Sequence, residues 1–254
     1  MITLDSILAQ AATRVDSFSR TAADIPYERK GVLYSEMLFL RAALGDSPPP
    51  RLVESGRARG QSTHLLAACL PGTQILSVEH DPNSPDVPVA AARLAPFANV
   101  KLLFGDSMVV VPELVQPGDA VLIDGPKGYR ALRLAFDVLA RCRPGVVFIH
   151  DCGLGSEERT FLDRHVPGTL YSDARAYVDR YAFLDEPCRA VHPDAARVQR
   201  EAGRSYGPTV ACLPYDPQRD YASLRRRSRM SALSDRVANG IRRRFGSPGH
   251  ASSG

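Results

Sequence analysis

The sequence predicts an α/β fold, a doubly wound and mostly parallel sheet flanked by helices. Three observations predict it. Short apolar runs alternate with stretches whose apolar residues recur at helical spacing. Most of the short runs end in a polar or ionisable residue, and parallel strands would bring those residues to one edge of the sheet. The first run leads into Gly56 and Gly60, which precede a helix-like run from Ser62.

The expected strands and helices follow one another along the chain. After a helix at 4–18 and another at 34–44, the first strand contains Leu52 and Val53. The other expected strands cover 74–78, 100–104, 120–123, 146–149 and 208–213. The other expected helices cover 64–70, 90–95, 109–114, 131–140 and 157–165. Five strands alternating with four helices, before the late strand, are typical of a doubly wound sheet.

Length and composition are those of a globular protein. The 254 residues suit one α/β domain with additional segments. The sequence contains no apolar run long enough to span a membrane and no pattern typical of a secretory signal. The five cysteines are scattered without a C-x-x-C pair, which favours a reducing compartment over a disulfide framework or a structural zinc site. The expected location is the cytoplasm.

The loop after the first strand has the pattern E-x-G-x-x-x-G, from Glu54 to Gly60. Glycines are needed where the backbone takes a positive φ or lets a ligand approach closely. The N–H groups at the start of the next helix would face the same crevice, outside the carboxyl ends of the strands. A dinucleotide fingerprint reads G-x-G-x-x-G, so this spacing argues against an NAD-dependent oxidoreductase. A glycine-containing βα turn without a ligand is the alternative.

Two further strand ends carry polar residues at the same edge. Glu79 ends the second strand, where a carboxylate can accept two hydrogen bonds from a ribose diol. A solvated carboxylate without a ligand is the alternative. Asp106 and Ser107 follow the third strand and suit the edge of an adenine ring.

Residues from about 30 to 213 resemble a class I S-adenosylmethionine-dependent methyltransferase, and most of all the catechol and caffeoyl-CoA type of O-methyltransferase. The run from Glu54 to Ser62 matches the E-x-G-x-x-x-G-x-S loop of that group without a gap. The resemblance implies a seven-stranded, Rossmann-like sheet with an antiparallel edge, and S-adenosylmethionine as the cofactor. The residues implied to bind the cofactor are Glu54, Gly56, Gly60, Ser62, Glu79, Asp106, Ser107 and Asp124.

The ends of the fourth and fifth strands carry the residues that the resemblance assigns to catalysis. In the family an aspartate binds a divalent cation and a lysine three residues later is the general base, and Asp124 and Lys127 keep that spacing. Such a base needs a lowered pKa. At the fifth strand the family has two adjacent metal ligands, which here are Asp151 and Cys152. Because a thiol is a poor ligand for Mg²⁺, either Asp124 and Asp151 hold Mg²⁺ or another divalent cation with water, or His150 favours a softer metal.

The positive charge is concentrated near the C-terminus. The net charge is +4, yet residues 219–245 hold nine arginines and two aspartates, so this stretch carries +7 and the remainder −3. Apolar residues recur there at steps of three and four, which predicts a basic amphipathic helix. Its predicted partners are a second copy of the chain, an anionic membrane surface at which the protein would be peripheral, or another polyanion. Methylation of nucleic acid is a further alternative.

The resemblance predicts an O-methyltransferase that acts on a hydroxyl of a small molecule, such as a sugar, a natural product or a catechol-like compound. Lys127 and Asp124 are the predicted catalytic residues. The chain is expected to comprise an N-terminal helical cap (1–47), a methyltransferase-like catalytic domain (48–217), and a basic helix with a disordered tail (218–254). The alternative is a catalytically degenerate protein that functions through its arginine-rich tail.

Overall fold

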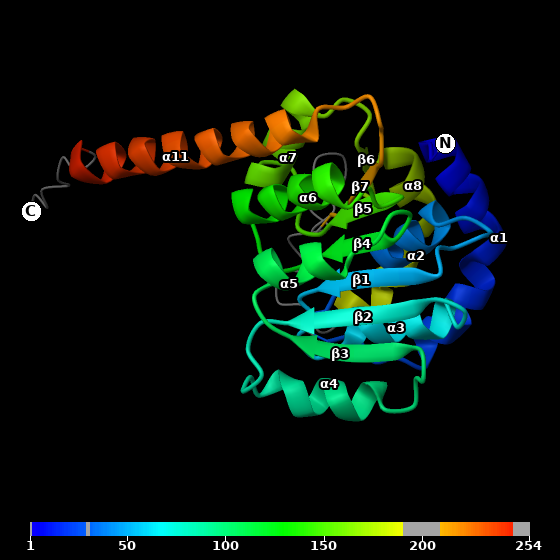
Figure 1. Cartoon of the computed structure of the whole chain (residues 1–254). Coiled ribbons are helices and arrows are strands. Elements are labelled where there is room, and N and C mark those ends of the chain that lie inside the picture. Colours follow the sequence, from blue (N-terminus) through cyan, green and yellow to red (C-terminus); the bar gives the residue numbers. More distant parts are fainter. Residues whose placement is uncertain (1, 29–30, 190–208, 246–254) are drawn as a thin grey trace, which may run out of the picture.

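A seven-stranded sheet forms the centre of the computed structural model, which describes residues 2–28, 31–189 and 209–245 (Figure 1). The strands lie in the order β3-β2-β1-β4-β5-β7-β6. The first five are parallel, whereas β7 runs antiparallel to its neighbours β5 and β6. The strands are β1 (Arg51–Ser55), β2 (Gln74–Glu79), β3 (Val100–Phe104), β4 (Ala120–Ile123), β5 (Val146–Ile149), β6 (Leu170–Tyr171) and β7 (Ala211–Pro214). The predicted seven-stranded, mostly parallel sheet is confirmed.

Helices cover both faces of this sheet (Figure 1). One face packs against α1 (Leu4–Ala23), α2 (Tyr34–Ala43), α3 (Gln61–Cys69) and α8 (Arg175–Tyr181). The other packs against α5 (Ser107–Leu114), α6 (Tyr129–Arg141), α7 (Glu157–His165) and the first turns of α11 (Tyr221–Phe245). The remaining helical elements are α4 (Asp86–Leu94), which contacts α3, the 3-10 turn η1 (Ala182–Asp185) and α9 (Glu186–Arg189).

Successive side chains of the strands point to opposite faces of the sheet, and they contribute to two separate hydrophobic cores. In β1, Leu52 joins the core under α1, α2 and α3, whereas Val53 joins the core under α5 and α6. Neighbouring residues of β5 divide in the same way, with Phe148 in the first core and Val147 in the second. Successive side chains of a strand point to opposite faces, so a strand covered by helices on both sides is apolar throughout. This explains the unbroken apolar runs in the sequence.

Several predicted boundaries differ from the observed ones. The first helix continues to Ala23, and α4 begins at Asp86 instead of residue 90. Between the helix expected at 157–165 and the late strand, where the sequence predicted no element, the structure contains β6, α8, η1 and α9. The late strand begins at Ala211, and the expected disordered tail lies outside the described residues. Because α1 and α2 share one core with the sheet, the N-terminal cap is an integral layer of the fold.

The helices show no candidate membrane span. Within the described ranges, none combines the length and the apolar character that crossing a bilayer requires.

Candidate active site

The candidate site lies where the strand order reverses, between β1 and β4. In open α/β sheets, ligands bind outside the carboxyl ends of the strands at such a point. The loops that follow the two strands touch there: Gly56 has φ +85°, and a Cβ at this position would lie 2.6 Å from the backbone nitrogen of Gly125. The backbone N–H groups of Asp124 and Gly125 both donate to the carbonyl of Ser55. Gly56 is therefore required for the close contact between the two loops.

The second glycine of the loop starts helix α3. Gly60 is the residue immediately before the helix and has φ +77°, in the left-handed region that favours glycine. A Cβ there would lie 3.0 Å from the side chain of Leu94 in α4, so the glycine also lets α4 pack closely. The N–H groups of the first turn of α3 are free of intrahelical partners and suit a polar or anionic ligand. The structure thus places Gly56 and Gly60 as predicted, although ligand binding by them stays a prediction.

Arg57, between the two glycines, is a buried structural residue. Its Nη1 donates to the carbonyl oxygens of Ser77 (2.7 Å) and Leu103 (2.9 Å), and its guanidinium lies 4.7 Å from the centre of the Phe104 ring. The side chain therefore ties the glycine loop to the ends of β2 and β3.

Replacing Arg57 with methionine is expected to lower the free energy of unfolding by about 1–3 kcal/mol, because two carbonyl oxygens lose their donor. Arg59→Met is the matched control, because Arg59 is 42% exposed and forms one ion pair with Glu28. We expect a change below about 1 kcal/mol for the control. Urea unfolding of the three proteins measures both values, and equal losses in the two variants would contradict the structural role of Arg57.

Glu54, at the start of the glycine-loop pattern, is buried inside the fold. Its carboxylate is fully buried and accepts hydrogen bonds from the hydroxyls of Ser62 (2.5 Å), Ser77 (2.6 Å) and Thr63. These partners come from α3 and β2, so Glu54 joins the start of the helix to two strands. The carboxylate faces the interior and positions Ser62, which lines the crevice, and the predicted cofactor contact of Glu54 stays a prediction.

Glu79 and the following loops lie at the same edge. The Glu79 carboxylate accepts hydrogen bonds from the backbone N–H groups of Ala58 (2.9 Å) and His80 (2.8 Å), one on each oxygen. A carboxylate offers about four acceptor sites, so two remain for a ligand diol. Asp106 caps α5 through the N–H of Met108, and its side chain is 44% exposed. The predicted contacts of Glu79 and Asp106 with the cofactor remain predictions that this placement allows.

Ser107 is turned away from solvent. It is buried, and its hydroxyl is hydrogen-bonded to that of Ser55 over 2.8 Å. Ser55 also bonds to the carbonyl of Gly125, so Ser107 belongs to the contacts that hold the ends of β1 and β4 together. Its predicted role at the adenine edge remains untested.

The crevice beside the glycine loop is bounded partly by the segment that precedes α2. Glu28 reaches across to Arg59 (3.2 Å) and Arg93 (2.5 Å), and its backbone N–H donates to the side chain of Gln61. The lining residues are Glu28, Gly31, Val32, Arg57, Arg59, Gln61, Ser62 and Asp124. The crevice therefore connects the glycine loop with the end of β4.

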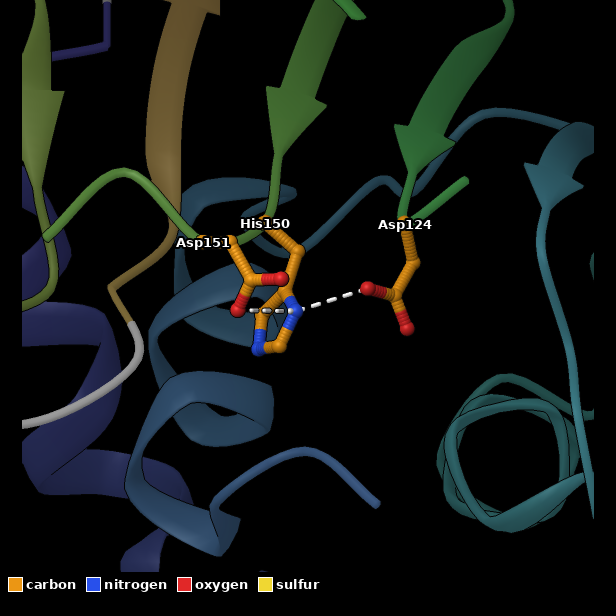
Figure 2. Close-up of side chains that lie close together, drawn as sticks. All are labelled: Asp124, His150 and Asp151. Carbon is orange, nitrogen blue, oxygen red and sulfur yellow. Dashed lines mark hydrogen bonds and ion pairs between the residues drawn. The ribbon is translucent and has the colours of Figure 1, made fainter. Parts of the chain in front are cut away.

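A cluster of charged side chains lies at the ends of β4 and β5 (Figure 2). His150 Nδ1 lies 2.7 Å from Asp124 Oδ1 and 3.3 Å from Asp151 Oδ1. The ammonium of Lys127 lies 2.5 Å from Asp124 Oδ1 and 2.6 Å from Asp151 Oδ2. Asp151 has φ +62°, a conformation that is uncommon outside glycine and often marks a functional position. The structure thus brings together the predicted residues Asp124, Lys127 and Asp151.

Two members of this network were given no definite role by the sequence. His150 Nε2 lies 3.3 Å from Glu36 Oε2, and both side chains are buried. Glu36 also accepts a hydrogen bond from the N–H of Leu33, so it is the third-position glutamate of a helix start. That local pattern predicts a cap for α2. It does not reveal the contact with His150, because the two residues lie 114 positions apart in the sequence.

Charge pairing dominates the electrostatics of this network. Burial alone would raise the pKa of Asp124, but His150 and Lys127 hold the pKa well below its usual range. Burial would lower the pKa of His150, yet Asp124 and Glu36 raise it well above its usual value. Burial likewise opposes the charge of Lys127, but Asp124 and Asp151 raise its pKa. The lowered pKa expected for Lys127 as a general base is therefore corrected, because the ammonium lies between two carboxylates.

The residues fit a divalent cation poorly. Asp124, His150 and Asp151 each offer a ligand atom, and these atoms lie within 4.8 Å of one another. The same carboxylates, however, already pair with Lys127. Cys152, at the position of the family's third ligand, is fully buried, and burial raises the pKa of its thiol well above the usual value. A protonated, buried thiol is no ligand for Mg²⁺, so the predicted metal at Asp124 and Asp151 stays a prediction that this arrangement does not favour.

The central part of the chain matches a known family. Residues 53–152 match a family model described as a methyltransferase domain. The matched segment runs from β1 to the residue after Asp151, so it contains the glycine loop and the charged cluster. No curated protein matches the chain.

Solved structures with a similar fold include several methyltransferases. The O-methyltransferase TomG from Streptomyces achromogenes, solved with SAM, has 20% identity and a TM-score of 0.47, with 85% of this chain and 92% of that chain covered. An O-methyltransferase from Bacillus cereus in complex with SAH has 18% identity and a TM-score of 0.45, with coverage of 81% and 90%. A Podospora anserina methyltransferase bound to SAH has 14% identity and a TM-score of 0.46, with coverage of 80% and 87%.

Proposed function

We propose that the methyltransferase domain binds S-adenosylmethionine beside the glycine loop and transfers its methyl group to a hydroxyl oxygen of a small molecule. One observation carries the proposal. Within the segment that matches the methyltransferase family, the Gly56 loop and the Asp124 loop are in backbone contact, so a ligand on the glycine loop lies next to the charged cluster. Glu79 supports the nucleoside end of the same ligand.

The chemistry requires alignment more than it requires a strong base. Methyl transfer from a sulfonium is an in-line displacement, in which the bond from sulfur to carbon breaks as the bond from oxygen to carbon forms. Holding the two reactants in line supplies much of the acceleration. As the oxygen gains its new bond, its proton becomes acidic, and the half-exposed carboxylate of Asp151 lies at the mouth of the cluster to accept it. Asp124 orients Lys127 and His150 around that position.

The test is an acceptor screen that reads both products. S-Adenosylmethionine with a labelled methyl group is incubated with the protein and with phenols, catechols, sugars and natural products that carry free hydroxyls. We expect release of S-adenosylhomocysteine and a new methyl ether, identified by mass spectrometry. Transfer to matched amines or thiols but to none of the hydroxyl compounds would contradict the proposal.

A second candidate function concerns the C-terminal helix. The first turns of α11 pack against α6 through Tyr221, Leu224 and the ion pair between Arg225 and Asp137 (3.1 Å). Beyond them the helix extends away from the sheet (Figure 1). On its described part, exposed arginines accompany exposed apolar side chains. These residues are Arg226, Arg227, Arg229, Met230 and Leu233. We propose that this helix contacts an anionic membrane surface, to which basic amphipathic helices bind.

Truncation after Arg225 removes these five exposed residues, so it is expected to abolish binding to vesicles that contain phosphatidylserine and to leave binding of S-adenosylhomocysteine unchanged. This site is preferable to truncation after Tyr215, which would also remove the buried Tyr221 and Leu224. Co-sedimentation with anionic and with neutral vesicles measures the effect. Binding to RNA but not to vesicles would favour a nucleic-acid partner, and a concentration-dependent dimer lost on truncation would favour a second copy of the chain.

A further inference from the structure

The ammonium of Lys127 occupies the position between the two carboxylates at the strand ends. It lies 2.5 Å from Asp124 Oδ1 and 2.6 Å from Asp151 Oδ2. These two carboxylates come from neighbouring parallel strands, so they face the same side of the crevice (Figure 2). A cation that bridged them would have to displace the ammonium. Lys127 and a divalent cation are thus competitors for one position.

The surroundings of the two carboxylates also suit a single positive charge. Cys152 offers a thiol instead of an oxygen ligand, and this thiol is buried and donates to the carbonyl of His150 over 3.9 Å. His150 turns Nδ1 towards Asp124 and Nε2 towards Glu36, so both ring nitrogens already have carboxylate partners. Mg²⁺ prefers oxygen ligands in octahedral geometry, and two shared carboxylates and an occupied imidazole do not provide it.

We propose that Lys127 replaces the divalent cation of this site, so that the methyltransferase domain positions its acceptor hydroxyl without a metal. The inference rests on the proposed function for its catalytic meaning. A lysine ammonium has three donors on a flexible stem. Two of its donors hold Asp124 and Asp151. The third is free to donate to the acceptor oxygen, and the half-exposed side chain of Lys127 can reach a bound molecule.

The role of Lys127 then differs from that of a general base. The ammonium keeps its proton, contacts the acceptor oxygen as a donor and fixes its position in line with the methyl carbon. The proton of the acceptor hydroxyl passes to the carboxylate of Asp151, and the sulfonium becomes a neutral thioether as its methyl group leaves. The balance needs no oxidant, reductant or third reactant. Lys127 is therefore a catalytic residue that acts through its charge and its position.

Titration with Mn²⁺, monitored by electron paramagnetic resonance, tests the replacement without any methyl transfer. The wild-type protein and three variants are compared: Lys127→Ala, Lys101→Ala and the double variant Lys127→Ala with Asp124→Asn. Lys101 is the matched control, because it is an exposed lysine on β3, outside the charged cluster. Thermal melting of each protein verifies that it is folded.

We expect the wild type and Lys101→Ala to bind no Mn²⁺ at concentrations below about 1 mM, which is the dissociation constant of weak cation sites. Lys127→Ala should gain one site, which the double variant should lose. Binding of one Mn²⁺ by the wild type would overturn the proposal, and so would absence of binding by both the wild type and Lys127→Ala. None of these results depends on methyl transfer, so a failure of the proposed function would be seen separately, in the acceptor screen.

Discussion

The Asp124→Asn variant is expected to lose about 10²-fold or more in kcat, because displacement of reacting groups by about 1 Å can cost that much. Asp124 Oδ1 accepts hydrogen bonds from both Lys127 and His150. An asparagine removes the negative charge that holds these two cations together, so both side chains would move apart. The measurement is the steady-state rate of methyl transfer at saturating S-adenosylmethionine, with the best acceptor from the screen.

Asp179→Asn is the matched control for this prediction. Asp179 is 62% exposed on α8 and pairs with Arg175 on the same helix. Its replacement should change kcat less than twofold, and both variants should have circular dichroism spectra like that of the wild type. A kcat for Asp124→Asn within a factor of three of the wild-type value would show that Asp124 is not needed for catalysis.

The Gly56→Ala variant is expected to have a free energy of unfolding about 2–5 kcal/mol below that of the wild type. It should also bind S-adenosylhomocysteine at least about tenfold more weakly. Two costs add: a positive φ for a residue with a Cβ costs about 1–2 kcal/mol, and overpacking costs about 1–3 kcal/mol. The overpacking is against backbone, since the new Cβ would lie 2.6 Å from the nitrogen of Gly125 and 3.0 Å from the carbonyl carbon of Asp124. Neither atom can rotate away.

Gly118→Ala separates these two costs. Gly118 also has φ +85°, but a Cβ there would have no neighbour within 4 Å. Its replacement should cost only the conformational part, about 1–2 kcal/mol. Urea unfolding gives the stabilities, and calorimetry gives the ligand affinities. Equal losses of stability in the two variants would show that the contact between the Gly56 and Asp124 loops contributes little.

Local patterns in the sequence predicted six of the seven strands, whereas the two-residue strand β6 was not located from them. The strands at 120–123 and 146–149 were predicted with their observed bounds, because a strand buried on both faces is a short unbroken apolar run. The edge strand at 100–104 was also predicted with its observed bounds, although it contains the exposed Lys101 and none of its residues is fully buried. The glycine loop was also predictable, because Gly56 and Gly60 mark positions where the backbone of a single turn takes a positive φ. The late segment after α7 was harder, because η1 and α8 are short and their packing on α2 is a tertiary property.

Side-chain directions were not predictable from spacing. Glu54 shares the glycine-loop pattern, yet its carboxylate turns inwards to three hydroxyls that lie 8, 9 and 23 residues away in the sequence. The contact between Glu36 and His150 depends on how α2 docks, which is fixed in part by the hydrogen bonds from Ser35 to Asp185. The pKa of Lys127 was expected to fall, because the spacing Asp124 to Lys127 does not reveal that the ammonium also meets a second carboxylate from the next strand.

A calorimetric titration of the purified protein with S-adenosylhomocysteine, in the presence of EDTA and again with Mg²⁺, tests whether this edge of the sheet holds the cofactor. We expect saturable binding of one molecule per chain, with the same affinity under both conditions and a much lower affinity in Gly56→Ala. No saturable binding by the wild type would contradict the claim that this edge of the sheet holds the cofactor. Binding that required Mg²⁺ would instead contradict the replacement of the metal by Lys127.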